Sequence, residues 1–259
     1  MDAGTYPNKY SYIKMGDPSN EKILVIPGVN DEIIRSTHYP LFLRYHFRGL
    51  TPEYRVIVTS RKKGLETGKT TEDFAEDYRK ILEQEGNCHV LGVSLGGMIA
   101  QQLATKTGDV DRLVLGLTAA ELSEEGEENL EKWIKLVQEE RYSSLYREVI
   151  DDTFSGPQKI LYKRIASRLG HRLSNQPNSD LLTSCKACIQ YTGARAARSI
   201  DNKTLIIGAK ADSFFPENMI NSTAQKIGAE TKYIPGKHAA FYQKHSEFHD
   251  KVLRFLSRP

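Results

Sequence analysis

Short apolar segments alternate along this chain with longer segments of helical periodicity. Runs rich in valine and isoleucine recur through the sequence, and between them apolar residues return every three to four positions. Such alternation is typical of βαβ units, which predicts an α/β fold with a mostly parallel sheet flanked by helices. The predicted parallel strands are residues 23–26, 54–59, 88–93, 112–117, 203–207 and 231–234, and residues 10–14 are expected to add an antiparallel strand before them.

The clearest predicted helix begins after Thr70. Phe74, Tyr78, Ile81 and Leu82 are spaced as i, i+4, i+7 and i+8, which gives the helix a single apolar stripe to pack against the sheet. Thr70 is the predicted N-cap, because a threonine hydroxyl can accept a hydrogen bond from the first turn of a helix.

Between residues 120 and 192 the alternation stops. This stretch has helical periodicity and no convincing strand. Its apolar residues fall at i, i+3, i+4 and i+7 in two helices, first at Leu130, Trp133, Ile134 and Val137, then at Tyr142, Leu145, Tyr146 and Val149. We therefore predict an α/β core made of residues 1–119 and 193–259, with residues 120–192 inserted as a helical cap.

The composition is that of an ordinary globular protein. The chain has 259 residues, 39% of them hydrophobic, and 36 Lys and Arg against 33 Asp and Glu leave a net charge of +3. The two signs are interleaved, so neither nucleic acid nor an anionic membrane is expected as a partner. The longest apolar run, at residues 23–26, is far shorter than the roughly 20 residues that span a bilayer. We expect a cytoplasmic protein.

Three cysteines, Cys88, Cys185 and Cys188, are a small and odd number, which favours free thiols in a reducing compartment over a disulfide framework. Cys185 and Cys188 are about one helical turn apart on the same face. One such pair cannot fill a tetrahedral zinc site, and no His or Cys near it in the sequence completes one. The interpretation that we adopt is helix packing, with no metal site, and the alternative is a redox or metal role.

Residues 88–100 carry the most informative motif. A buried strand runs through Gly92-Val93-Ser94-Leu95-Gly96 into a helix. In such a Gly-x-Ser-x-Gly turn the serine backbone is strained and its Oγ is lifted off the sheet, while side chains at the two glycines would collide with the neighbouring strand and helix. Ser94 is the predicted nucleophile, and the alternative is a glycine-rich turn that only packs helix against sheet.

A serine hydroxyl needs a base to take its proton and a third group to orient that base. His238 follows the last predicted strand, where its side chain can reach across the carboxyl edge of a parallel sheet. Asp212 follows the strand before it and is the predicted orienting acid, with Glu121 as the alternative acid and a helix cap as the alternative role of Asp212. The other histidines are expected to be structural or solvated: His38, His46, His89, His171, His245 and His249.

Negative charge on a tetrahedral intermediate requires two converging N–H donors. Leu95, directly after the nucleophile, is expected to supply one of them. Val29, in the loop after the first parallel strand, is expected to supply the other, with Gly28 letting the backbone turn inward. An ordinary turn is the alternative for that loop. Gly28, Asn30 and Trp133 are the predicted substrate contacts.

The order Ser94, Asp212, His238, together with the turn around Ser94 and the helical insertion, resembles the α/β-hydrolase superfamily over almost the whole chain. It is most similar to the capped esterase and lactonase branch. That resemblance implies hydrolysis of esters, lactones, thioesters or activated carbon–carbon bonds without a cofactor.

The sequence also departs from the pattern that the family often shows. Pro27 and Val93 stand where the family often has His, and residues 59–64 replace a frequent Asp-x-x-Gly-x-Gly loop. These departures leave the mechanism intact and concern the substrate.

The function that these residues predict is that of a serine hydrolase acting on a small carboxylic ester. An acyltransferase or perhydrolase with the same three residues is one alternative. The other is a ligand-binding receptor built on a hydrolase scaffold, against which the intact set of Ser94, His238 and Asp212 argues.

Overall fold

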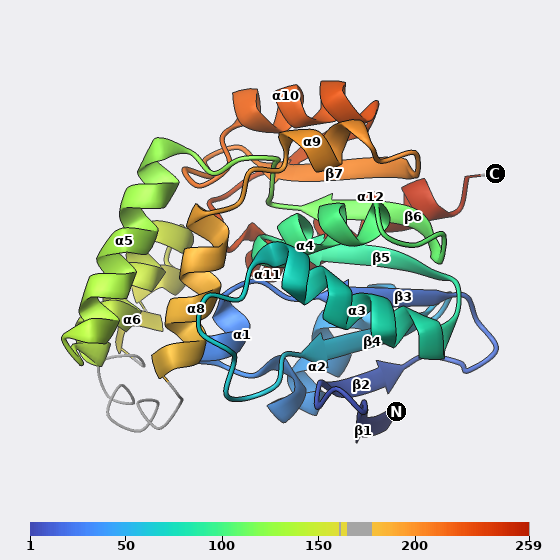
Figure 1. Ribbon diagram of the computed structural model, residues 1–259, viewed down its shortest axis with the longest axis horizontal. Helices are drawn as coiled ribbons and strands as arrows, with labels where there is room; N and C mark the ends of the chain where they lie inside the picture. Colours follow the sequence, from blue (N-terminus) through green and yellow to red (C-terminus); the bar gives the residue numbers. More distant parts are fainter. Residues whose placement is uncertain (161, 165–177, 259) are drawn as a thin grey trace.

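The computed structural model describes residues 1–160, 162–164 and 178–258. Its strands form one sheet in the order β1-β2-β4-β3-β5-β6-β7-β8 (Figure 1). β1 and β2 run antiparallel to their neighbours, and β3 to β8 pair in parallel. The strands are β1 (Asp2–Thr5), β2 (Ser11–Met15), β3 (Lys22–Ile26), β4 (Arg55–Ser60), β5 (Cys88–Val93), β6 (Val110–Gly116), β7 (Lys203–Ala209) and β8 (Glu230–Ile234).

The predicted mostly parallel sheet is confirmed, and each predicted strand is present with bounds shifted by no more than two residues. β1 is an addition to the prediction. Its sequence, Asp-Ala-Gly-Thr, is mostly exposed and has no apolar alternation, so the pattern gave no signal. β1 exists because its backbone pairs with the edge of β2, from Asp2 opposite Lys14 to Thr5 opposite Ser11.

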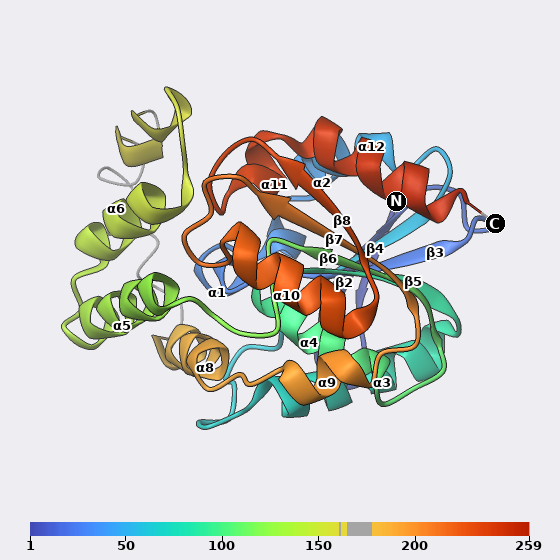
Figure 2. The same cartoon turned by 90° about the horizontal axis from the view of Figure 1, so that it is seen from above.

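Helices cover both faces of the sheet, as Figure 2 shows from above. One face carries α3 (Thr71–Glu85), α4 (Leu95–Ala104), α9 (Ala194–Arg198) and α10 (Glu217–Ile227). The other carries α2 (Pro40–His46), α11 (Ala240–Gln243) and α12 (His245–Leu256). Each layer buries its own apolar cluster against the sheet. No helix in the described part of the chain is both long and apolar enough to cross a membrane.

The predicted helix after Thr70 is confirmed in detail. Thr70 is the N-cap of α3, and its hydroxyl accepts a hydrogen bond from the N–H of Asp73 at 3.2 Å. The carboxylate of Asp73 accepts the N–H of Thr70 in return at 2.8 Å, which completes a capping box. Phe74 and Tyr78 are among the apolar residues that α3 buries.

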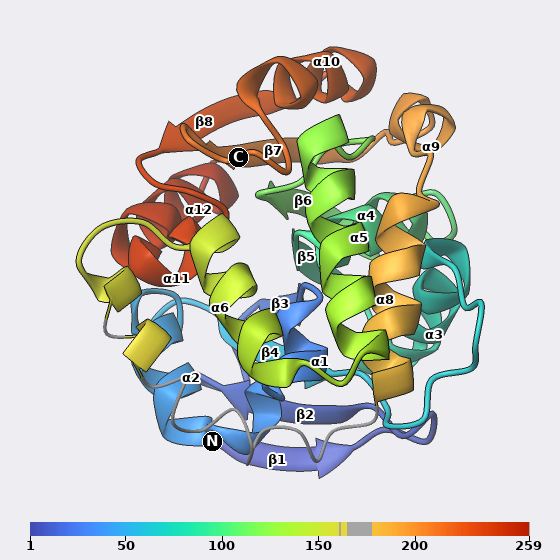
Figure 3. The same cartoon turned by 90° about the vertical axis from the view of Figure 1, so that its left-hand side faces the viewer.

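The described helices of the insertion stand across the carboxyl ends of the strands (Figure 3). They include α5 (Glu124–Gln138), α6 (Tyr142–Thr153) and α8 (Asn178–Ile189), and no strand occurs in the described part of residues 120–192. Residues 161 and 165–177 of the predicted cap lie outside the described residues. α8 contacts α1 (Asn30–Ile33) and α4, so the insertion is packed directly on the core.

Candidate active site

Ser94 lies on a sharp turn between β5 and α4. Its φ of 55° and ψ of −123° are unusual for a non-glycine residue, and its N–H donates to the carbonyl of Gly116 at 2.9 Å. The turn is possible because two glycines flank it: a Cβ at Gly96 would lie 2.0 Å from the carbonyl oxygen of Ile26. One at Gly92 would lie 2.3 Å from the carbonyl oxygen of Gly96. The strained backbone that the motif predicts is therefore present.

His238 and Asp212 meet Ser94 from the loops after β8 and β7. His238 Nε2 lies 2.9 Å from Ser94 Oγ, and His238 Nδ1 lies 2.8 Å from Asp212 Oδ2. The three side chains come from positions 144 and 26 residues apart in the sequence, and the parallel sheet brings them to one edge. A chain of hydrogen bonds of this kind lets an imidazole accept a proton from a serine hydroxyl.

Asp212 is held firmly in this arrangement. Its side chain is fully buried, and Oδ1 accepts the N–H of Phe214 at 2.9 Å. It does not cap the next helix, because α10 begins after Pro216 without a side-chain cap. Glu121, the alternative acid, is exposed, and the structure bonds Asp212 rather than Glu121 to His238.

Two aromatic rings cover the imidazole of His238. The ring centroids of Phe214 and Phe215 lie 4.7 Å and 5.6 Å from that of His238. The side chain of His238 is consequently 13% exposed. A low local dielectric strengthens the charge interaction that develops when such an imidazole is protonated beside a carboxylate.

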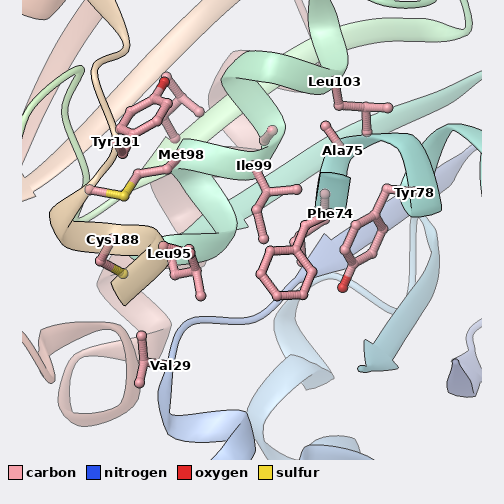
Figure 4. Packing of buried hydrophobic residues seen from close by; sticks show 14 of the residues in the cluster. Val29, Phe74, Ala75, Tyr78, Leu95, Met98, Ile99, Leu103, Cys188 and Tyr191 are labelled. Atoms are coloured by element: carbon pink, nitrogen blue, oxygen red, sulfur yellow. The ribbon is translucent and has the colours of Figure 1, made fainter. Parts of the chain in front are cut away.

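Val29 and Leu95 present backbone N–H groups next to Ser94. Val29 is the N-cap of α1 and Leu95 opens α4, where N–H groups have no partner within the helix. No acceptor among the described residues takes either N–H. Gly28 brings its loop against Ser94, since a Cβ at Gly28 would lie 3.1 Å from Ser94 Cβ. Figure 4 shows Val29 and Leu95 at the same end of α4.

Solved structures with a similar fold extend over nearly the whole chain. An α/β hydrolase from a Medee basin deep-sea metagenome library has a TM-score of 0.84 and 20% identity, covering 100% of this chain and 98% of its own. The enol-lactonase of Burkholderia xenovorans LB400 has a TM-score of 0.84 and 16% identity, covering 99% and 100%. An esterase from Exiguobacterium antarcticum has a TM-score of 0.74 and 18% identity, covering 96% of each chain.

The chain has the α/β-hydrolase fold. No family model matches the sequence. No curated protein matches it either. The likeness to solved structures is thus the comparison that places the chain in a known fold.

Asn30 and Trp133, two of the predicted substrate contacts, both use their polar groups within the protein. The Asn30 amide donates to the hydroxyl of Tyr242 at 2.7 Å, and burial raises the pKa of Tyr242 to about 12. The Trp133 indole donates to Asp152 at 2.8 Å, and its ring lies 5.5 Å from that of Phe214. In this α/β-hydrolase fold, Trp133 is therefore separated from His238 by one aromatic ring.

Sequence reasoning missed Asp152 and Tyr242. Burial raises the pKa of the Asp152 carboxyl, which accepts the hydrogen bond of the Trp133 indole. Asp152 lies 19 residues from Trp133 in the sequence, and Tyr242 lies 212 residues from Asn30. No signal in the sequence pointed to either residue.

The remaining histidines that the structure describes lie away from Ser94. His89, on β5, faces the carboxylate of Asp111 at 3.1 Å. The rings of His46, His245 and His249 lie between α2 and α12, 5.2 to 6.0 Å apart. His38 is exposed in a short 3-10 helix, and His171 lies outside the described residues.

The cysteines serve as packing residues. All three are buried and unpaired, and burial raises the pKa of the Cys188 thiol to about 12. A thiol with such a pKa is protonated at neutral pH and is a poor nucleophile or metal ligand. Among the described residues, no three His, Cys, Asp or Glu side chains are grouped so as to hold a metal ion.

A surface cavity of about 670 Å³ lies away from this site. Its lining residues are Pro7, Asn8, Lys9, Lys62, Lys63, Gly64, Glu66, Thr67, Gly68, Lys69, Asp73, Glu76, Asp77 and Lys80. Several of its charges pair with one another, such as Lys69 with Asp77 at 2.7 Å and Lys62 with Glu66 at 3.3 Å. The cavity is therefore lined by charges of both signs and contains none of Ser94, Asp212 and His238.

Proposed function

We propose that this protein is a serine hydrolase that cleaves small carboxylic esters through an acyl-enzyme. The observation that carries the proposal is the hydrogen-bond chain from Ser94 Oγ through His238 to the buried Asp212, at 2.9 Å and 2.8 Å. The likeness to an esterase and an enol-lactonase supports the same class of reaction.

The proposed reaction begins when His238 Nε2 takes the proton of Ser94 Oγ as that oxygen attacks the ester carbonyl carbon. Asp212 accepts the N–H of Nδ1, so the tautomer is fixed and the imidazolium that forms is stabilised. The N–H groups of Val29 and Leu95 donate to the oxyanion of the tetrahedral intermediate.

The intermediate collapses when the carbon–oxygen bond to the alcohol breaks. His238 gives its proton to the leaving alcohol oxygen, and the acyl group stays on Ser94. Water then attacks the acyl carbon while His238 Nε2 takes its proton, and the same donors hold the second oxyanion. Breaking of the bond to Ser94 Oγ releases the acid and returns the proton to Ser94.

We further propose that residues 120–192 form a cap that selects the acyl group. Trp133 packs on Phe214, which packs on His238, so the insertion reaches the reacting groups through apolar rings. The carbonyl of Thr153 at the end of α6 accepts the N–H of Ala239, next to His238. An apolar wall favours uncharged acyl groups, with about 1 kcal/mol or more for each methylene that fits.

Turnover of p-nitrophenyl esters with graded acyl length tests both parts of the proposal. We expect a length optimum with roughly tenfold steps in kcat/KM. Ser94→Ala should fold normally and lose roughly 10⁴ to 10⁶-fold in kcat. Equal turnover by the parent and Ser94→Ala would contradict the proposed nucleophile. If added alcohol or hydrogen peroxide captures most of the acyl group, acyl transfer replaces hydrolysis as the reaction.

A further inference from the structure

Arg61 is a fully buried arginine directly after β4, 1% exposed. Its Nε and Nη2 donate to the two carboxylate oxygens of Glu32 at 2.5 Å and 2.6 Å. Its Nη1 donates to the carbonyl of Pro27 at 2.8 Å, and Nη2 also donates to the carbonyl of Gly28 at 2.6 Å. One guanidinium therefore binds two consecutive backbone carbonyls of the loop that carries Val29.

The direction of the Gly28 carbonyl determines where the Val29 N–H points. The carbonyl of Gly28 and the N–H of Val29 belong to one peptide unit, which is planar and trans because no cis peptide is present. In a trans peptide the carbonyl and the N–H point in opposite directions. A hydrogen bond that holds the Gly28 carbonyl toward Arg61 thus holds the Val29 N–H away from Arg61.

Position 28 is where such a restraint is most needed. Glycine is conformationally permissive, so a peptide next to it can rotate at little cost. A larger residue is not an alternative, because a Cβ at Gly28 would meet Ser94 Cβ at 3.1 Å and the carbonyl oxygen of Val93 at 3.2 Å. The close approach to Ser94 requires glycine, and the Gly28 carbonyl is held twice: it accepts the N–H of Asp31 from its own loop at 3.2 Å and the shorter hydrogen bond of Arg61 from outside the loop.

Glu32 is itself held in place by a residue of the insertion. The hydroxyl of Ser184, on α8, donates to Glu32 Oε1 at 2.9 Å. α8 is fastened nearby through Asp180, whose carboxylate accepts the N–H groups of Gly64 and Leu65 at 3.0 Å and 2.7 Å. The loop with Val29, the segment after β4 and α8 thus form one hydrogen-bonded unit.

We propose that Arg61 and Glu32 are positioning residues that fix the Val29 N–H in the direction of the oxyanion. We call this pair the Arg61–Glu32 clamp. It rests on the proposed hydrolase function, touches neither the substrate nor Ser94, and acts through the peptide between Gly28 and Val29. Loss of the clamp should weaken stabilisation of the transition state more than binding of the ester.

Three variants weaken the clamp to different degrees. Arg61→Lys keeps the charge but cannot bind two carbonyls and a carboxylate at once, because an ammonium lacks the planar fork. Arg61→Met together with Glu32→Leu replaces both charges of the pair with apolar side chains, while the neighbouring buried carboxylate of Asp31 keeps its hydrogen bonds from Ser36, Ser60 and the backbone N–H of residue 61. Ser184→Ala removes only the hydroxyl that donates to Glu32.

The expected result is a loss in kcat with little change in KM. For Arg61→Lys and the double variant we expect kcat on a p-nitrophenyl ester to fall roughly 10 to 100-fold, and for Ser184→Ala about threefold. The affinity for phenylboronic acid, which forms a tetrahedral adduct with a serine hydroxyl, should fall by a similar factor. The double variant should melt closer to the parent than Arg61→Lys does, but its kcat should stay below that of the parent.

Arg112 provides a matched control. At the start of β6, its guanidinium also donates to two backbone carbonyls, those of Phe255 and Arg258, far from Ser94. Arg112→Lys should alter the melting temperature while kcat stays within about twofold of the parent. A comparable loss of kcat in Arg112→Lys would show that the Arg61 variants act through general loosening of the fold.

Several outcomes would overturn the clamp. A folded double variant with parental kcat, or a loss of kcat with unchanged affinity for phenylboronic acid, contradicts it. If neither Arg61 variant folds, parental kcat and boronate affinity in Ser184→Ala contradict it. A parent that hydrolyses no ester refutes the hydrolase function and the clamp with it, whereas an active parent with unaffected variants refutes the clamp alone.

Discussion

His238 and His249 are both packed among aromatic rings, but they differ in the hydrogen-bond partners of their ring nitrogens. His238 lies against Phe214 and Phe215, and its two nitrogens bond Ser94 and Asp212. His249, on α12, lies 5.4 Å from the ring of Phe47 and 5.2 Å from that of His46. Neither nitrogen of His249 has a hydrogen-bond partner in the described part of the chain.

This difference separates a reactive histidine from a packing histidine. Burial, with the neighbouring His245 and Arg48, lowers the pKa of His249 to about 3, and burial likewise puts the pKa of His46 well below its usual range. Both rings are therefore neutral at pH 7 and pack as flat, weakly polar groups. Aromatic surroundings alone do not make a histidine a base; a fixed acid on one nitrogen and a hydroxyl on the other do so.

The largest expected difference between His238 and His249 is the effect on kcat when each imidazole is removed. His238→Ala should lose roughly 10⁶-fold in kcat, because without the base the hydroxyl of Ser94 keeps its proton. His249→Phe preserves the packing of α12 and should keep kcat within about threefold of the parent. Steady-state kinetics on one ester, with melting temperatures for both variants, provide the measurement. Similar losses of kcat in the two variants would remove the distinction.

The orienting acid gives the next largest effect. Asp212→Asn should lose roughly 10⁴-fold in kcat, because an amide donates to Nδ1 and holds the wrong tautomer of His238. Glu121→Gln, the matched control, should have parental activity since Glu121 is exposed. The same assay ranks the two variants, and the opposite ranking would reassign the acid to Glu121.

The packing histidines should lower the free energy of unfolding as the pH falls. The pKa of His249 is lower in the folded protein than its ordinary value near 6.5, so the unfolded chain takes up the proton first as the pH falls. The free energy of unfolding should therefore decrease from about pH 6.5 down to about pH 3. By pH 4.5 this single group accounts for a decrease of about 3 kcal/mol.

His249→Phe tests this linkage because phenylalanine does not titrate. Urea unfolding of the parent and the variant at pH 7.5 and pH 4.5 should show a smaller decrease in the variant. If the two proteins lose the same free energy of unfolding between these pH values, His249 does not titrate as the structure indicates.

The sequence was most informative where a strand or a site residue follows from a local pattern of residue types. The strands follow from short apolar runs, and Ser94 follows from glycines that a tight turn requires on either side. Asp212 and His238 could be found because each lies in a loop directly after a predicted strand, and parallel strands end at the same edge.

The Arg61–Glu32 clamp could not be found in this way. Its partners are 29 residues apart and meet only when β4 and the loop after β3 lie side by side. In the sequence, Arg61 lies within residues 59–64, which replace a loop that is frequent in the α/β-hydrolase superfamily. Nothing local indicates that its side chain is buried. The bond between Trp133 and Asp152 depends likewise on how α5 packs against α6.

The most direct test of the proposed Ser94 chemistry is mass spectrometry of the protein after reaction with a fluorophosphonate. This reagent phosphonylates a serine whose proton is taken by a base, so we predict one adduct per chain, on the peptide that contains Ser94. Ser94→Ala should carry no adduct, and His238→Ala should react far more slowly than the parent. An adduct on another residue, or equal labelling of the parent and Ser94→Ala, would contradict Ser94 as the nucleophile.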